Sequence, residues 1–500
     1  MDDQTPKIAS RRLRWARALI IAVTGAVLLS IWFGSPSDYP IVQPDAYENL
    51  TAAYNLGHHG VISTEDNPAV TTPEPSEYRE PLPIAVLAGY ITALQPVHGD
   101  KPLGDLMFGD NARLLKQSNI VWGVLLSFVV FCTIVRYTGS YAWAAFGTLT
   151  THIGLAEEYN GLYTEVVGAA MLALTCAVAA AAVRKQTAGW TFATGLLFGA
   201  MTLTKAAFLY VSVVLIGCVA AWGLWRLVRA RDALVLKSVA LVSLGLVMVV
   251  APWMVRNYVH FDEWSLSGRG GQVLLTRAVK NQMTPEEYRG AWFAYAPRPL
   301  RWVASKLTGF DRDDLADGGR LVRLMRHVSP RDRPAEAAGR PQDAVSYFAK
   351  VKAMRAELEM RDPEASSLEI DDALKQRALG MITAEPLAHL AATPLFLWRG
   401  APYVFAILLA GALYACARRR WWLLAYVAPA MGLVLFYAAL THFIPRYALP
   451  MLPVASVAFA VLGHTALNAT LAWRTRRTSA RSTALEACAL NNPRMSEAGR

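Results

Sequence analysis

The side chains that could do chemistry together are concentrated in residues 43–83, directly after the first apolar run. Asp45 lies near the start of this stretch, and Arg79 and Glu80 lie near its end, just before two prolines. A positioned carboxylate can take the proton from a hydroxyl nucleophile, which typically speeds a reaction ~10²–10⁴-fold. An arginine presents a fork of N–H donors that fits phosphate oxygens. This combination suits a reaction in which a hydroxyl attacks and a phosphate leaves.

Further charged and polar residues lie at the ends of later apolar runs. A departing phosphate gains negative charge, and cations aimed at it in a partly dry site stabilise the transition state. We predict that Asp45 is the catalytic base. The residues predicted to bind the phosphate are Arg79, Lys205, Arg256 and Arg446. The residues predicted to line the same cavity are Tyr47, Glu48, Glu80, Glu165, Asn257, His442 and Tyr447.

Each of these residues also has a purely structural interpretation. An acid in the first turn of a helix, such as Asp45 or Glu165, stabilises the helix dipole. Lysine and arginine at the end of an apolar helix often extend their charged group to the membrane interface, and this applies to Lys205, Arg256 and Arg446. The sequence predicts no metal site, because the His58-His59 pair has no third ligand at suitable spacing. A requirement for a divalent cation stays open, and no other cofactor is indicated.

The elements that must position these residues are membrane helices. Hydrophobic residues make up 54% of the 500 residues and charged residues only 17%, against about a quarter in soluble domains. The apolar residues form runs of roughly 17–25, the length that crosses a bilayer as a helix. About ten such runs follow one another, near residues 18–34, 119–135, 141–156, 162–183, 190–204, 206–225, 234–251, 400–417, 421–440 and 448–470. The predicted fold is therefore an all-α polytopic membrane protein.

The charge distribution predicts how this chain is oriented. The net charge of +11 comes from short basic clusters at the ends of apolar runs, so membrane lipids are expected partners and nucleic acid is not. With ten spans every cluster falls on the side of the N-terminus, which the positive-inside rule places in the cytoplasm. The predicted location is the cell (inner) membrane, with the site facing the periplasm or exterior. The five cysteines form no CxxC pair, so no disulfide framework is predicted.

Four parts of the chain are predicted. Residues 1–257 form an N-terminal membrane domain whose first outer loop, 35–112, holds the catalytic acid and the short amphipathic helix 47–56. Residues 258–398, here called the outer region, are helical and extracytoplasmic, with a capping box at 284–287 and helices over 342–360, 367–383 and 386–398. Residues 399–472 are C-terminal transmembrane helices. Residues 473–500 are a polar cytoplasmic tail that we expect to be disordered.

A set of short motifs resembles a known family. They are Asp45-Ala46-Tyr47, YREPLP at 78–83, LYTE at 162–165, GLLFGAMTLTK at 195–205, APWMVRNY at 251–258 and PRYALPMLP at 445–453. In their order and placement they are similar to the GT-C membrane glycosyltransferases, in the branch of the protein O-mannosyltransferases and the lipid A aminoarabinose transferase. The resemblance covers about residues 15–275 and 385–465.

The resemblance implies an enzyme that transfers a sugar from a polyprenyl-phosphate donor to a lipid, glycan or protein acceptor, with inversion. A carboxylate in the first outer loop would deprotonate the acceptor. Many relatives have two adjacent acids there, whereas this chain has Asp45-Ala46, so the base is Asp45 alone or with Glu48 or Glu80. Two alternatives stay open: a polysaccharide polymerase or ligase that uses polyprenyl-diphosphate donors, and a transporter of lipid-linked sugars.

Overall fold

The computed structural model describes residues 37–316, 318–325 and 346–491, together with parts of 16–32. Side chains are described up to residue 477. Every regular element in these residues is helical, which confirms the all-α prediction. The first predicted span, 18–34, lies only partly within the described residues.

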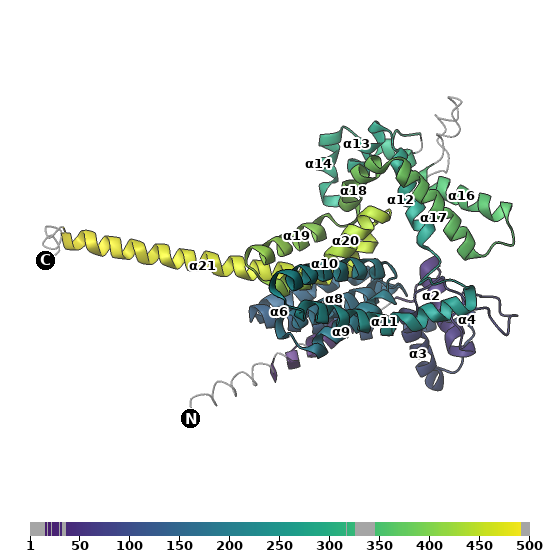
Figure 1. The fold of residues 1–500 in the computed structure, drawn as a ribbon, viewed down its shortest axis with the longest axis horizontal. Helices are drawn as coiled ribbons and strands as arrows, with labels where there is room; N and C mark the ends of the chain where they lie inside the picture. The colour runs from purple at the N-terminus through teal and green to yellow at the C-terminus, as the bar shows by residue number, and fades with distance from the viewer. Residues whose placement is uncertain are drawn as a thin grey trace.

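The bundle consists of long apolar helices that lie side by side (Figure 1). They are α6 (Ser118–Thr138), α7 (Tyr141–Leu155), α8 (Glu165–Lys185), α9 (Ala188–Thr202), α10 (Ala207–Ala230), α11 (Leu234–Phe261), α19 (Pro402–Ala417), α20 (Trp421–Leu440) and α21 (Leu452–Asn491). Helix α8 is the central one, because it packs against α6, α9 and α20. Its buried face is rich in alanine and glycine, which lets neighbouring helices approach closely.

Six helices in the described residues are long and apolar enough to cross a membrane. A seventh span results if α18 (Pro386–Gly400) and α19 count as one broken span, since they meet at an angle of 103°. The expectation of about ten spans included α7 and α9, which are helical but have only 15 residues each. These two helices contribute to the bundle without meeting the length of an independent span.

The remaining helices belong to the first outer loop and to the outer region. The first outer loop forms α2 (Pro44–His59), α3 (Pro81–His98), α4 (Leu103–Leu106) and α5 (Gly109–Lys116). The outer region forms α12 (Gly270–Ala278), α13 (Pro285–Ala294), α14 (Arg301–Thr308), α16 (Tyr347–Arg361), α17 (Ser367–Ala384) and α18. Of these helices, α2, α3 and α4 lie at one end of the bundle, and those from α12 to α18 lie above that end and above α20 (Figure 1). Short 3-10 turns connect them, among them η1 (Ala156–Asn160), η2 (Val279–Gln282) and η7 (Pro445–Met451).

Local sequence signals set the starts of these helices. The predicted capping box is present: Thr284 accepts from the Glu287 backbone, and the Glu287 side chain accepts from the Thr284 backbone. Ser366 and Glu369 form a second box at the start of α17. Proline occupies the first turn of α2, α3 and α18, where its missing N–H costs nothing.

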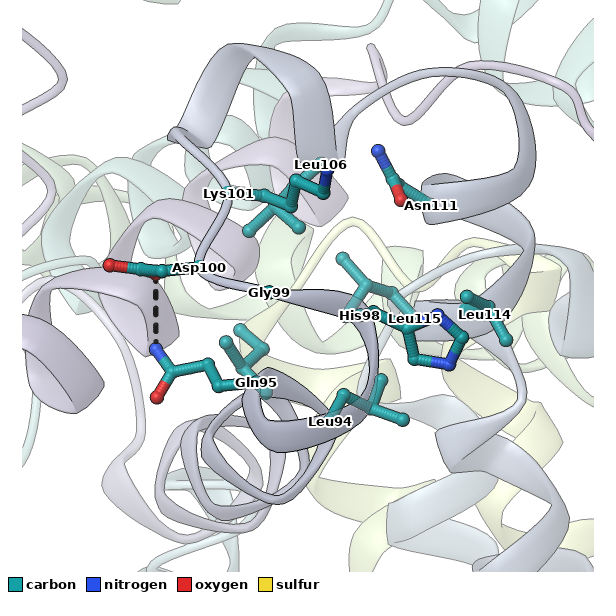
Figure 2. A pocket seen from close by; sticks show the side chains of 11 residues that line it. Leu94, Gln95, His98, Gly99, Asp100, Lys101, Leu106, Asn111, Leu114 and Leu115 are labelled. Carbon is teal, nitrogen blue, oxygen red and sulfur yellow. Dashed lines mark hydrogen bonds between the residues drawn. The ribbon is translucent and has the colours of Figure 1, made fainter.

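A small cavity of about 30 Å³ lies between the end of α3 and the segment that leads to α5 (Figure 2). The Asp100 carboxylate, beside it, accepts a hydrogen bond from Gln95 and contacts the His58 ring. The volume is enough for about one water molecule, so this cavity is a packing feature of the first outer loop.

The predicted disorder of the C-terminal tail is wrong as far as residue 491, because α21 continues to Asn491. Residues 478–490 are rich in alanine, leucine and other good helix formers. Extending an existing helix also avoids the cost of nucleation, so a polar sequence without hydrophobic periodicity can still be helical.

Helices α9 and α11 are in close backbone contact through two glycines. An ideal Cβ at Gly195 would lie 2.2 Å from the Val242 carbonyl oxygen, and one at Gly245 would lie 2.7 Å from the Phe192 carbonyl oxygen. Helix α9 leads into Lys205, and α11 leads into the 262–269 loop. The close contact therefore sets the distance between two segments of the site.

We predict that Gly195→Ala destabilises the protein by about 1–3 kcal/mol, because the methyl group would overlap the α11 backbone. Gly217→Ala on α10 is the matched control, since nothing lies within 4 Å of its added Cβ. The control should be neutral or more stable by up to about 1 kcal/mol from helix propensity. Thermal unfolding of the purified protein in detergent measures both, and equal midpoints for the two variants would contradict the close contact.

Candidate active site

Asp45 lies at the centre of a cluster of three guanidinium groups. Arg79 Nη2 lies 3.0 Å from Asp45 Oδ1, Arg269 Nη2 lies 3.3 Å from the same oxygen, and Arg446 donates to Oδ2. The four residues come from α2, the 77–80 turn, the loop before α12, and η7. We call them the Asp45 cluster. Segments more than 400 residues apart thus meet at one carboxylate.

The surroundings of Asp45 keep it ionised. Burial by itself would raise the pKa of the Asp45 carboxyl, but the hydrogen bond from Arg446 and the charges of Arg79, Arg269 and Arg446 outweigh it. The pKa is held well below its usual range. A carboxylate with so low a pKa is a weak base. To accept a proton, Asp45 must lose part of its contact with these cations.

A second carboxylate, Glu165, contacts Arg446 and Lys205. Glu165 is buried at the start of α8, where a negative charge is favourable. Its Oε1 lies 3.2 Å from Arg446 Nε and 3.6 Å from Lys205 Nζ. Lys205 also donates to the Thr164 hydroxyl. Arg446 therefore bridges Glu165 and Asp45, and Lys205 is fixed beside them.

These charges line a cavity of about 790 Å³. Of the residues predicted from sequence, the cavity is lined by Asp45, Arg79, Glu80, Glu165, Lys205, Arg446 and Tyr447. Apolar side chains form another part of its wall, from α10, α20 and α17: Leu209, Tyr210, Phe436, Leu440 and Leu379. Tyr210 is 60% exposed, on a helix whose apolar surface is largely uncovered by protein. The cavity thus joins a charged end to an apolar wall.

Arg269 was missed by the sequence analysis. It lies in the Ser- and Gly-rich stretch 265–271, away from any apolar run, so its position did not single it out. Its guanidinium lies over the Tyr78 ring, with Cζ 4.5 Å from the centroid. The sequence feature that could have identified Arg269 is an arginine flanked by glycines between a membrane span and the next helix.

The loop that carries Arg269 is held from two sides. The Gly268 N–H donates to the Glu77 carbonyl oxygen, and Ser367 of α17 donates to the Glu77 side chain. The Asp371 carboxylate, also on α17, accepts from the backbone N–H groups of Gly271 and Gln272 at 2.7 and 2.9 Å. Helix α17 of the outer region therefore positions a residue of the Asp45 cluster.

The prediction that Arg256 binds a phosphate in this cavity is wrong. Its guanidinium donates to the backbone carbonyls of Ser76 and Ile62 and to the Asn257 side chain, and it does not line the cavity. Asn257 is fully buried and donates to the Ser265 carbonyl. Both residues fasten the first outer loop and the 262–269 loop to the end of α11.

Three further predicted residues lie next to the cavity wall rather than on it. Tyr47 donates to the Asp66 carboxylate, and Glu48 accepts from Arg79. The His442 ring lies against the Tyr447 ring at 5.5 Å between centroids, and its carbonyl accepts from Arg399. Glu80, which does line the cavity, accepts from the Ala206 backbone at 3.5 Å. Glu48 and His442 thus support residues of the site.

The site does not fit a divalent cation. Among the described residues, no three His, Cys, Asp or Glu side chains converge. Asp45 and Glu165 both face guanidinium or ammonium groups, which would repel a metal ion.

A second cavity of about 380 Å³ shares Arg446 and Tyr163 with the first. Arg446 Cζ lies 4.8 Å from the Tyr163 ring centroid. Glu158 of η1 lines this second cavity. Burial, with the charge of Glu165 next, raises the pKa of Glu158 to about 7, against the opposing effect of Arg446 and Lys205. Near neutral pH a proton can therefore be gained or lost at this position.

No protein-family model and no curated protein matches the chain. Solved structures that are similar to it include two of ArnT from Cupriavidus metallidurans. The structure bound to undecaprenyl phosphate is 16% identical, with 91% of this chain and 79% of that chain covered and a TM-score of 0.34. The apo structure is 16% identical, with 88% and 77% covered and the same TM-score.

The raised pKa of Glu158 predicts a pH-dependent stability. Between pH 4.5 and 7 the unfolded chain loses this proton first, so the folded state binds more protons and stability falls as the pH rises. Glu158→Gln should remove this component and be more stable than the natural protein at pH 8, on the order of 1 kcal/mol after solvent screening. Thermal unfolding between pH 5 and 8 measures the difference. Asp110→Asn, at an exposed acid away from this cavity, is the control, and parallel pH profiles for all three proteins would contradict the assignment.

Proposed function

We propose that the protein is an integral membrane glycosyltransferase that moves a sugar from a polyprenyl-phosphate donor to a hydroxyl acceptor. The observation that supports this best is the cavity in which the Asp45 cluster, Glu165 and the Lys205 ammonium group adjoin an apolar wall. A lipid phosphate matches both parts of that cavity: a single anionic group for the cations, and an isoprenoid chain for the apolar side chains.

The chemical step follows from the charges. The acceptor oxygen attacks the anomeric carbon from the face opposite the phosphate, its proton passes to Asp45, and the bond from carbon to phosphate oxygen breaks with inversion. The electron pair leaves on the phosphate, where Arg269, Arg446 and Lys205 stabilise the added charge.

The arginine cluster couples donor binding to the strength of the base. Without donor, the cations face Asp45 and hold its pKa low. A phosphate that attracts Arg269 and Arg446 weakens their contact with the carboxylate, so the pKa of Asp45 rises toward its ordinary value. Asp45 thus becomes a better base only when a donor is present. Glu165 keeps Arg446 and Lys205 in place during this exchange.

The apolar wall gives the donor a route from the bilayer. Tyr210 of α10 stacks on Phe436 of α20, with ring centroids 5.5 Å apart, and both line the cavity. A polyprenyl chain lying along α10 and α20 would bring its phosphate to Lys205 and Arg446. We place this end of the bundle at the outer face of the inner membrane, on the charge pattern of the sequence, with a lipid, glycan or protein hydroxyl as acceptor.

Asp45→Asn should lower sugar transfer by about 10²–10⁴-fold, because the amide cannot accept the proton. Mass spectrometry of envelope lipids and glycans first identifies the product that is missing from cells without the gene. Cells that carry Asp45→Asn should lack the same product while the protein remains in the membrane. Asp110→Asn is the control, because Asp110 is an exposed acid of the same loop. Full product with Asp45→Asn would end the assignment of the base.

Arg269→Met should weaken binding of undecaprenyl phosphate by about 10–100-fold, the effect of losing one hydrogen bond to a charged group. Binding of undecaprenol, which has no phosphate, should not change. Native mass spectrometry of the purified protein with each lipid measures both. Arg361→Met, at the exposed end of α16, is the control. Equal binding of the two lipids by the natural protein would contradict a phosphate site, and tighter binding of undecaprenyl diphosphate would favour a diphosphate donor.

A further inference from the structure

A second group of cations lies in the outer region, next to the segment that leads into η7 and Arg446. Arg277, Lys280 and Arg399 surround the aromatic pair Tyr295 and Phe396, whose ring centroids are 6.0 Å apart. Arg277 Cζ lies 4.3 Å from the Phe396 centroid, and Arg399 Cζ lies 4.4 Å from the Tyr295 centroid. Lys280 Nζ lies 5.3 and 5.4 Å from the Phe396 and Tyr295 centroids.

This group is buried and has little negative charge near it. Arg277 is fully buried and Lys280 is 5% exposed. In the part of the chain that the structure describes, neither forms an ion pair with a carboxylate. The acid nearby, Glu287, already accepts from the Tyr347 hydroxyl and the Thr284 backbone and faces Arg323. Within the described residues, these two buried cations therefore have no counter-ion.

The same place has hydrogen-bond donors without acceptors. Arg277 uses its terminal nitrogens on Asn281, the His389 carbonyl and Thr393, but its Nε has no partner among the described residues. Asn281 Nδ2 and the Tyr295 hydroxyl are likewise buried without a partner there. Buried polar groups are normally satisfied, so three such groups beside an ammonium need an explanation.

Contacts with the aromatic rings alone do not compensate for the burial of these cations. The attraction between a cation and a ring is smaller than the cost of moving an ammonium or guanidinium group out of water. Burial, followed by the charges of Arg399 and Arg277, holds the pKa of Lys280 well below its usual range. A bound anion would reverse this effect and accept from the free donors.

We propose that Arg277, Lys280, Tyr295 and Asn281 bind a small inorganic anion, a halide or an oxyanion such as phosphate or sulfate. The anion would neutralise the buried cations and accept hydrogen bonds from the Tyr295 hydroxyl, Arg277 Nε and the Asn281 amide. This site is separate from the Asp45 cluster and does not depend on the proposed transfer reaction.

The position gives such an anion a structural effect on the active site. Arg399 donates to the His442 carbonyl, and the His389 ring contacts the Ala439 carbonyl, so this group braces residues 439–442. These residues lead directly into η7, which carries Arg446. The anion would thus link α12, α13 and α18 next to the segment that leads into η7.

The test is thermal unfolding of the full-length protein in detergent, starting from a gluconate buffer. Adding chloride, phosphate or sulfate should raise the unfolding midpoint by several degrees, with saturation at millimolar concentration. A rise with chloride alone identifies a halide site, and a rise with phosphate and sulfate identifies an oxyanion site. Lys280→Met should lose the rise, and in gluconate it should unfold at or above the temperature of the natural protein.

Two further variants make the outcome decisive. Tyr295→Phe removes one donor and should weaken the apparent affinity for the anion about tenfold, the effect of one hydrogen bond. Arg361→Met, an exposed cation at the end of α16 in the same region, should keep the full rise. The proposal is overturned if the natural protein shows no saturable rise, or if Lys280→Met shows the same rise, as a general salt effect would produce.

Discussion

The structure of this protein depends on one electrostatic constraint: a single carboxylate, Asp45, lies among three guanidinium groups. One carboxylate cannot neutralise three cations, so the cluster has an excess of positive charge in a partly buried place. Glu165 and Glu48 match this excess through Arg446 and Arg79, and Lys205 adds one further cation beside Glu165. A phosphate would therefore bind by drawing these cations away from their carboxylates.

The constraint also gives helix α17 of the outer region a role at the site. Arg269 belongs to a flexible type of sequence, rich in serine and glycine, and would not stay beside Asp45 without support. Asp371 supplies that support by capping the first N–H groups of α12 from a helix that lies a hundred residues further along the chain. Helix α17 therefore has a role in the site although it contributes no charged group to the Asp45 cluster.

The sequence analysis identified Asp45, Arg79, Lys205 and Arg446 correctly as neighbours because each lies at the same end of an apolar run, and the alternation of spans places such ends in one layer. It could not tell which face of a helix end points inward, and so Arg256 was assigned to the cavity although it binds backbone carbonyls. It could not find Arg269, since no apolar run ends there. The helical fold followed from composition, whereas the length of α21 did not, because a polar helix that continues an apolar one leaves no hydrophobic pattern to read.

Arg446 and Tyr163 together form the partition between the two cavities, since both side chains line each of them. A ligand that draws Arg446 toward one cavity changes the wall and the charge of the other cavity. Linkage requires this influence to be mutual, so a ligand in either cavity changes the affinity of the other cavity for its own ligand by the same factor. Two molecules bound in the two cavities would therefore change each other's binding affinity before any bond between them forms.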